Sequence, residues 1–376
     1  FKMLSAKETD QYQRHLSLPG FGVEGQLKLK NSSVLVIGAG GLGCPALQYL
    51  VAAGVGKIGI VDDDFVDISN LQRQVLFNHE DIGSSKAKVA KSKLSLLNPN
   101  IEIIDYPDRF NSVNAENLLR GFDVVVDGTD NFSTRYLIND ACIIYDKILV
   151  YGAIFQFEGQ VSVFNFNNGP TYRCLFPAPP SSNALPSCSE IGVLGVLPGI
   201  IGNLQALEVI KVITGLGDPL SGRVLLYDAL KQRTRMLKLN PTKNRHLITS
   251  LKEISLPCVT KQDDMREKII KEICPQELMS IMDTGNEVLV LDVREGWERE
   301  KSKISPSHHI PLGEFRSDKC PVLPDLLSNN IKIIVYCKAG VRSRIACQSL
   351  QEHGFKELHN LSGGILEWES EGFPVS

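Results

Sequence analysis

Four glycines and several charged residues in the first third of the chain have the types and spacing of a nucleotide site. Residues 34–43 read VLVIGAGGLG, which places Gly38, Gly40 and Gly43 in a G-x-G-x-x-G pattern after an apolar run, with Gly41 between them. Such glycines allow a tight turn and let the amides at a helix start approach phosphate. The alternative is a glycine-rich turn that only packs a helix closely against a strand.

Charged residues beyond this turn favour a triphosphate over a dinucleotide. Asp62 ends the next apolar run, as a ribose-hydroxyl acceptor would. Arg73 follows in a polar stretch, Lys86 lies just inside a predicted helix, and Asp130 follows another strand in DGTDN. Two cations suit a triphosphate and a nearby carboxylate suits Mg²⁺, whereas hydride transfer needs neither. We therefore predict ATP and Mg²⁺, with solvated surface charges as the alternative.

A second candidate site near the end of the chain is built around a thiol. VYCKAGVRSR at 335–344 places a cysteine between a predicted strand and a predicted helix, in the loop Cys337, Lys338, Ala339, Gly340, Val341 and Arg342. Inward-facing loop amides, the helix N-terminus and the Arg342 guanidinium would each favour an anionic sulfur. The loop predicts a reactive thiolate, with a buried strand-end cysteine as the alternative.

Alternating strands and helices must position these residues. We predict strands at 33–39, 57–62, 101–105, 123–129, 148–153, 160–166 and 223–229, and helices at 42–54, 85–98 and 131–147. This order predicts an α/β fold with a mostly parallel sheet, and the period-two pattern of 222–239 predicts an antiparallel extension. Asp62 and Asp130 then follow strand carboxyl ends, where open α/β sheets bind ligands.

The sequence changes character after about residue 248. Residues 249–273 are charged and weakly periodic, which predicts a flexible linker with some helix. A second alternation follows, with strands at 287–295 and 332–340 and a helix at 343–354. The predicted division is therefore a domain at 1–248, a linker at 249–273 and a smaller α/β domain at 274–376.

Composition argues against two classes of partner. The chain has 376 residues, a formal net charge of −3 and no long basic run, so we expect no nucleic acid. The longest apolar stretch, 191–202, is too short to span a membrane. Nine scattered cysteines without a C-x-x-C pair indicate reduced thiols. We expect a soluble protein of the cytoplasm or a plastid stroma.

Several motifs of the first domain occur together and in order. GAGGLGCPALQYLVAAGVGKIGIVDDDFVDISNLQRQVLF, GSSKA, DGTDNFSTRYLIND and VLPGIIGNLQALEVIKVITGLG resemble the MoeB/ThiF family, which shares its adenylating fold with ubiquitin-activating enzymes, over about residues 5–245. The resemblance implies a Rossmann-like fold that uses ATP and Mg²⁺ to convert the C-terminal Gly-Gly tail of a ubiquitin-like sulfur-carrier protein into an acyl-adenylate.

The resemblance also implies roles for individual residues. Arg73 and Lys86 contact phosphates, Asp130 binds Mg²⁺ or orients the carboxylate, and Arg14 reaches the ATP of a neighbouring subunit, which implies a homodimer. The nucleotide-binding set that the resemblance implies is Gly38, Gly40, Gly41, Gly43, Asp62, Ser69, Asn70, Leu71, Gln72, Arg73, Lys86, Asp130, Asn131 and Arg14.

The cysteines of this chain depart from the pattern of many family members. Those hold a structural zinc with two C-x-x-C pairs, whereas here TYRCLFP keeps only Cys174, with Thr171 at the other position, and 239–246 has no cysteine. One thiolate cannot build four-coordinate zinc, so we predict no zinc site. Cys188 matches the family cysteine on the loop over the carrier tail and is a candidate catalytic residue, with an incidental loop cysteine as the alternative.

The second domain resembles rhodanese in LVLDVREGWE, IPLGEF, CKAGVRS and LSGGILEWESEGFP. The resemblance implies that Cys337 carries sulfane sulfur and that Asp292 and Arg294 form a structural pair. Related phosphatases use a loop one residue longer, so the four residues between Cys337 and Arg342 favour sulfur over phosphate. A persulfide on Cys337 would then attack the adenylate, with a cysteine desulfurase as an expected donor.

Four functions stay open at this point. The leading one is a sulfur-carrier adenylyltransferase and sulfurtransferase for molybdenum cofactor synthesis. The second has the same chemistry on a carrier for thiamine synthesis or tRNA thiolation. The third is an NAD-dependent oxidoreductase, and the fourth is a non-catalytic scaffold that only binds a carrier.

Overall fold

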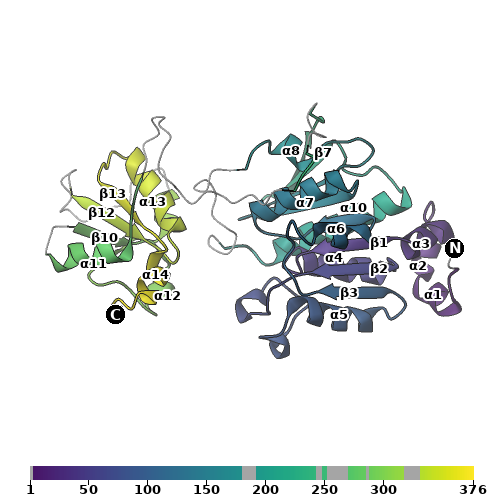
Figure 1. Ribbon diagram of the computed structural model, residues 1–376, viewed down its shortest axis with the longest axis horizontal. Coiled ribbons are helices and arrows are strands. Elements are labelled where there is room, and N and C mark those ends of the chain that lie inside the picture. Colours follow the sequence, from purple (N-terminus) through teal and green to yellow (C-terminus); the bar gives the residue numbers. More distant parts are fainter. Residues whose placement is uncertain (1–2, 180–191, 243–247, 252–269, 285–287, 317–330) are drawn as a thin grey trace. The chain divides into compact units, whose positions relative to one another are not determined.

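The chain forms two compact units, which we describe separately (Figure 1). The structure, a computed structural model, describes residues 3–179, 192–242, 248–251, 270–284, 288–316 and 331–376. The first unit holds the nucleotide-site candidates and the second holds the thiol loop.

An eight-stranded sheet with the order β3-β2-β1-β4-β5-β6-β7-β8 organises the first unit. Neighbouring strands are parallel from β3 to β5 and antiparallel from β5 to β8. The strands are β1 (Ser33–Ile37), β2 (Lys57–Val61), β3 (Glu102–Tyr106), β4 (Val124–Asp127), β5 (Ile148–Phe155), β6 (Glu158–Phe164), β7 (Arg223–Asp228) and β8 (Arg233–Lys238). The strand order reverses between β1 and β4, which creates the switch point where open α/β sheets bind ligands.

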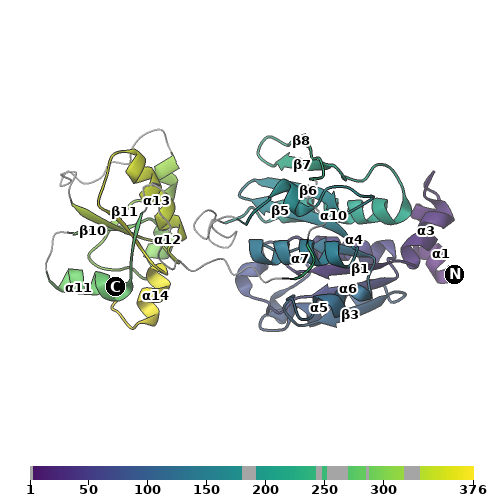
Figure 2. The same ribbon diagram turned by 45° about the horizontal axis from the view of Figure 1, so that its top comes forward.

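Helices cover both faces of this sheet (Figure 2). Val34 and Val36 of β1 face the core shared with α3, α4, α5 and α10, while Leu35 and Ile37 face the core shared with α6 and α7. Both alternating sets are apolar because a parallel strand is buried on both sides. The helices are α1 (Ala6–Gln11), α2 (Gln13–Leu16), α3 (Gly22–Lys30), α4 (Gly43–Ala53), η1 (Ile68–Asn70), η2 (His79–Asp81), α5 (Lys86–Leu97), α6 (Ala115–Arg120), α7 (Phe132–Ile144), α8 (Tyr172–Leu175) and α10 (Val196–Thr214).

The predicted elements of the first unit are confirmed. Each of the seven strands and three helices is present, and their ends differ from the predicted ones by at most three residues. Within the described part of the chain, α10 alone has the length and hydropathy of a membrane span. It packs against α4, β5 and β6, which is the environment of a core helix.

A five-stranded parallel sheet with the order β11-β10-β12-β13-β9 forms the second unit. Its elements are β9 (Lys271–Ile273), α11 (Pro275–Asp283), β10 (Val288–Asp292), α12 (Gly296–Arg299), β11 (His308–His309), η3 (Leu312–Arg316), β12 (Lys332–Tyr336), α13 (Val341–Glu352), β13 (Leu358–Leu361) and α14 (Gly364–Ser370). The core lies on both faces, with α13 on one and α11 and α14 on the other.

The edge strand β9 falls within 249–273, the range that the sequence predicts as linker. It pairs with β13, so residues 271–273 belong to the sheet of the second unit. A three-residue strand is too short to show a periodic pattern, which is why the sequence analysis missed it. Residues 252–269 of the predicted linker lie outside the described residues.

Candidate nucleotide and thiol sites

The glycine loop after β1 is locked against the loop after β4. Gly38 has a φ of +95°, and a Cβ on it would lie 2.8 Å from the carbonyl oxygen of Gly128. A Cβ on Gly43 would lie 1.8 Å from the carbonyl oxygen of Gly38. Both positions therefore need glycine, and the loop sits at the switch point between β1 and β4.

Asp62 is fixed against the backbone of this loop. Its Oδ2 accepts a hydrogen bond from Ala39 N at 2.7 Å, and its Oδ1 accepts one from Asp64 N at 2.9 Å. Burial raises the pKa of Asp62, and the amide of Ala39 and the charge of Lys86 oppose that rise. A carboxylate held beside the glycine turn has the position that a ribose acceptor requires.

Lys86 is paired with Asp64, which lies near Asp62 after β2 and which sequence reasoning did not single out. Its side chain is 6% exposed, and its Nζ pairs with Asp64 Oδ2 at 2.9 Å. Its backbone N donates to the carbonyl oxygen of Asp64 at 3.0 Å. The sequence signal for a partner of Lys86 was the run of three aspartates at 62–64, but only the turn after β2 determines which of the three contacts the lysine.

Gly41 and Arg73 meet beside the first turn of α10. A Cβ on Gly41 would lie 3.0 Å from Pro198 Cβ and 3.6 Å from Arg73 Cγ. The Arg73 Nη1 donates to the carbonyl oxygen of Ser69 at 2.9 Å, which ties the guanidinium to the turn around η1. One cation therefore adjoins the glycine loop, as a phosphate contact would require.

Asp130 lies on a loop that is held from two sides. Thr129 N and Oγ1 donate to Asp127 Oδ1 at 2.9 and 2.6 Å, and Arg135 Nη2 donates to the carbonyl oxygen of Thr129 at 2.8 Å. Burial raises the pKa of Asp127, and the charge of Arg135 opposes that rise. Asp130 itself is exposed beyond the carboxyl end of β4.

The remaining predicted residues have mixed placements. Asn70 Oδ1 accepts from Asp67 N at 3.3 Å, and Leu71 packs against the core. Gln72 is exposed, and its carbonyl oxygen would lie 2.1 Å from a Cβ on Gly195. These three residues line the turn that carries Arg73.

The three candidates that remain are Asn131, Arg14 and Cys188. Asn131 caps α7, because its Oδ1 accepts from Thr134 N at 2.9 Å. Arg14 lies on α2 at the surface, and its predicted role requires a second subunit. Cys188 lies outside the described residues.

The Cys174 thiol is contacted by two threonines. Its Sγ accepts from Thr171 N at 3.4 Å and Thr242 N at 3.3 Å, with their hydroxyls at 3.5 and 3.4 Å. Burial raises the pKa of Cys174, but these hydrogen bonds outweigh it and hold the pKa below its usual value. In the part of the chain that the structure describes, no three His, Cys, Asp or Glu side chains gather as metal ligands.

The thiol loop turns back on its sulfur as the sequence predicts. Cys337 is buried at the end of β12, and its Sγ accepts hydrogen bonds from Gly340 N at 3.2 Å and Ser343 Oγ at 3.4 Å. Gly340 has a φ of +89° at the start of α13. Gly364 lies against the loop, because a Cβ there would be 2.4 Å from the Cys337 carbonyl oxygen.

The Arg342 guanidinium has a partner that the sequence did not reveal. Arg342 Nη1 and Nη2 donate to Glu298 Oε2 and Oε1 at 2.6 and 2.7 Å. Burial lowers the pKa of Arg342, but Glu298 outweighs it and raises the pKa above its usual value. Because the two residues lie 44 positions apart, no local spacing signals the pair.

Asp292 and Arg294 form a buried pair at the end of β10. Arg294 donates to Asp292 through Nε at 3.0 Å and Nη2 at 2.8 Å, and Tyr336 Oη donates to the same carboxylate at 2.8 Å. Arg294 Nη2 also donates to the carbonyl oxygen of Ser302 at 2.7 Å. Side chains that are both buried and engaged in this way are suited to a structural role.

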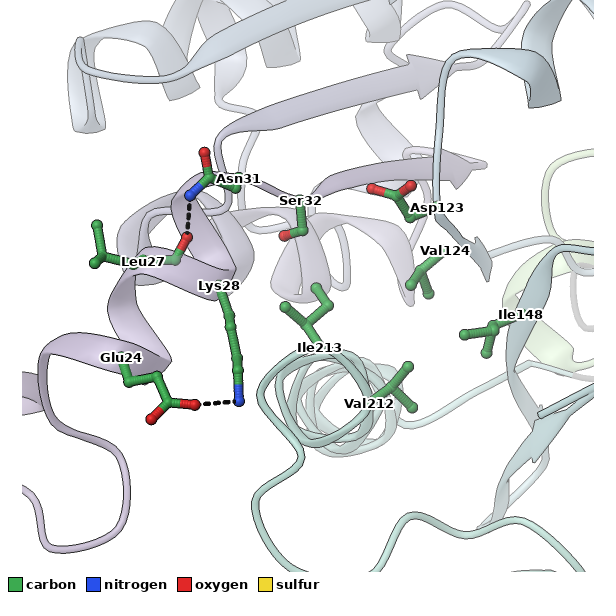
Figure 3. A pocket seen from close by; sticks show the side chains of 10 residues that line it. All are labelled: Glu24, Leu27, Lys28, Asn31, Ser32, Asp123, Val124, Ile148, Val212 and Ile213. Carbon is green, nitrogen blue, oxygen red and sulfur yellow. Dashed lines mark hydrogen bonds and ion pairs between the residues drawn. The ribbon is translucent and has the colours of Figure 1, made fainter. Parts of the chain in front are cut away.

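A cavity of about 560 Å³ lies at the amino-terminal ends of the strands of the first sheet. Figure 3 shows its lining, which includes Leu27 of α3, Val212 of α10, and Val124 and Ile148 at the amino ends of β4 and β5. Ligands of open α/β sheets bind at the carboxyl ends of the strands. This cavity is therefore separate from the nucleotide-site candidates.

Two family models match this chain. The ThiF family matches residues 12–248, and the rhodanese-like domain matches residues 275–371. The chain therefore belongs to the ThiF family and carries a rhodanese-like domain. It is an enzyme of the adenylyltransferase class with an added sulfurtransferase domain.

Relatives with both domains match nearly the whole chain. The adenylyltransferase and sulfurtransferase MOCS3-1 of Zea mays is 42% identical over 97% of this chain and 83% of its own length. The probable adenylyltransferase/sulfurtransferase MoeZ of Mycobacterium tuberculosis is 41% identical over 99% and 95%. The sulfur carrier protein adenylyltransferase of Thermus thermophilus is 55% identical over 61% and 87%.

Solved structures of similar fold include MccB of E. coli with MccA-N7isoASN. It has a TM-score of 0.56 and 21% identity, and the match covers 64% of this chain and 73% of that one. At this identity the likeness shows the fold alone.

Proposed function

We propose that this enzyme adenylates the C-terminal glycine carboxylate of a ubiquitin-like sulfur-carrier protein and then transfers sulfur to it from a Cys337 persulfide. The observation that carries the proposal is the presence on one chain of a switch-point site with Arg73, Lys86 and Asp130 and of a six-residue thiol loop. A nicotinamide site uses none of those three charges, and a scaffold needs no thiol loop.

In the adenylation step the carrier carboxylate attacks the α-phosphorus of ATP, and pyrophosphate leaves. Arg73 and Lys86 offset the repulsion between these anions, while Asp62 holds the ribose. The exposed carboxylate of Asp130 fits Mg²⁺, which takes one or two protein carboxylates together with phosphate oxygens. When bound there, Mg²⁺ supplies charge neutralisation on the phosphates. Asp127 and Arg135 keep the Asp130 loop in place.

In the sulfur-transfer step the terminal sulfur of the Cys337 persulfide attacks the adenylated carbonyl, and AMP leaves. The product is an acyl disulfide between the carrier and Cys337. A second thiolate, from Cys188 or an external thiol, then attacks the Cys337 sulfur. This releases the carrier thiocarboxylate and leaves a disulfide on Cys337.

The names of the relatives guide the choice of pathway and partners. The two-domain relatives called MOCS3 and MoeZ favour a carrier for molybdenum cofactor synthesis, and the Thermus relative is named for a sulfur carrier protein. A carrier for thiamine synthesis or tRNA thiolation is the second candidate. A cysteine desulfurase as donor and a homodimer with Arg14 at the partner's ATP complete the proposal.

ATP–pyrophosphate exchange with a panel of purified carriers tests this function. We expect exchange that depends on one carrier, is abolished in Asp130→Ala and persists in Cys337→Ser. In Cys337→Ser the thiocarboxylate, measured by mass spectrometry, should be absent. Carrier-independent behaviour or wild-type exchange in Asp130→Ala would contradict the proposal.

A further inference from the structure

The charge of Arg342 is cancelled by a residue of another element. Glu298 lies on α12, and its carboxylate makes two short hydrogen bonds to Arg342 near the start of α13. The side chains are 10% and 13% exposed, so solvent screens the pair only weakly. The bidentate carboxylate occupies the Nη1–Nη2 end of the guanidinium, one of the edges with which it would otherwise bind an anion.

The sulfur therefore receives its hydrogen bonds from neutral donors. Gly340 N and Ser343 Oγ contact the Cys337 Sγ directly. Glu298 also resists protonation: burial raises its pKa, but the hydrogen bonds from Arg342 outweigh this and hold the pKa below its usual range. The carboxylate stays ionised at neutral pH.

The other charges near the loop do not make it strongly cationic. Lys338 is exposed on the loop, and Glu295 acts electrostatically on Arg342 from the residue before α12. Glu367 of α14 lies against Gly363, because its Oε2 would be 2.0 Å from a Cβ on Gly363. Gly363 in turn lies against the thiol loop, because its backbone N would be 3.2 Å from a Cβ on Gly340. Arg294 also acts electrostatically on Glu298 but is itself paired with Asp292, so both Arg342 and Arg294 have carboxylate partners, a poor arrangement for a site that binds dianions.

We propose that Glu298 is a specificity residue of the thiol loop: by cancelling the Arg342 charge, it makes Cys337 accept sulfur from persulfides carried on thiols and discriminate against dianionic donors such as thiosulfate. The inference rests on the sulfur-transfer function proposed above. In the favoured step the Cys337 thiolate attacks the outer sulfur of R–S–SH. The S–S bond of the donor breaks, a new S–S bond forms on Cys337, and R–S⁻ leaves.

The test compares two alkylating agents of different charge at Cys337. The variant is Glu298→Gln, and the matched control is Glu300→Gln, an exposed glutamate two residues away. Rates of modification of the Cys337 peptide by iodoacetate and iodoacetamide are measured by mass spectrometry on the full chain. The ratio of the two rates removes any change in the thiolate fraction, because both reagents need the thiolate.

We expect Glu298→Gln to raise the iodoacetate-to-iodoacetamide ratio at least about fivefold, since the uncompensated Arg342 charge, which interacts electrostatically with Cys337, attracts the anion. The Glu300→Gln ratio should equal wild type. The ratio of sulfur transfer from thiosulfate to transfer from the persulfide of N-acetylcysteamine should rise in parallel. The double variant Glu298→Gln/Arg342→Gln, which also lacks the unpaired guanidinium, should return the ratio to the wild-type value.

Ratios within twofold of wild type for Glu298→Gln would overturn the inference while leaving sulfur transfer intact. A double variant that keeps a raised ratio would overturn it as well. A wild-type enzyme that takes no sulfur from either donor would instead count against the proposed function, and so the two failures can be told apart.

Discussion

A methyl group at Gly43 is the sharpest probe of the nucleotide site, because the structure leaves no room for it. A Cβ there would lie 1.8 Å from the carbonyl oxygen of Gly38, whereas real Cβ contacts are rarely under 3.0 Å. In Gly43→Ala the loop must therefore move by about 1.2 Å. A displacement of about 1 Å in a positioned group can cost about 10²-fold in rate. Overpacking of this kind also destabilises by about 1–3 kcal/mol.

The assay for Gly43→Ala is carrier-dependent ATP–pyrophosphate exchange, with sulfur transfer to cyanide as a readout of the separate second unit. We expect kcat/KM for ATP to fall about 10²-fold while sulfur transfer stays at the wild-type rate. Gly199→Ala is the matched control, since a Cβ there meets nothing within 4 Å, and it should retain full exchange. Exchange within twofold of wild type in a folded Gly43→Ala protein would refute the argument that this turn forms the nucleotide site.

Three further predictions concern individual contacts. Asp64→Asn should lower the KM for ATP severalfold with little change in kcat, because the Asp64 carboxylate competes with phosphate for Lys86. The control is Asp63→Asn, a change at an exposed neighbour. An unchanged KM in Asp64→Asn would contradict this prediction. Asp292→Asn should destabilise the second unit by about 3–5 kcal/mol in urea unfolding at pH 7, the cost of breaking a buried pair. Burial raises the pKa of Asp292, but Arg294 outweighs burial and lowers the pKa. The stability contributed by the ionised carboxylate is therefore fully present above the unfolded-state pKa and is lost as the pH falls through the folded-state pKa. A wild-type-like acid transition in Asp292→Asn would refute this. Metal analysis should find less than about 0.1 zinc per chain, and one zinc per chain would contradict the prediction that the chain has no zinc site.

Periodic and glycine-containing stretches were predictable because their signals are local. Each predicted strand and helix of the first unit depends on apolar spacing within about ten residues, and each is confirmed. The glycine pattern and the order of the charged residues place the candidates at the carboxyl ends of β1, β2 and β4 for the same reason. β9 escaped because three residues cannot display a period.

The sequence by itself determined the two α/β units, the glycine turn and the six-residue thiol loop, since each depends on neighbours along the chain. Only the tertiary structure decided which polar and charged side chains meet. Lys86 meets Asp64 across 22 residues, Cys174 meets Thr242 across 68, and Arg342 meets Glu298 across 44. A Coulombic contact depends on distance in space, which no pattern of spacing encodes. Arg342 is thus a cation of the thiol loop by sequence and one half of a neutral ion pair in the fold.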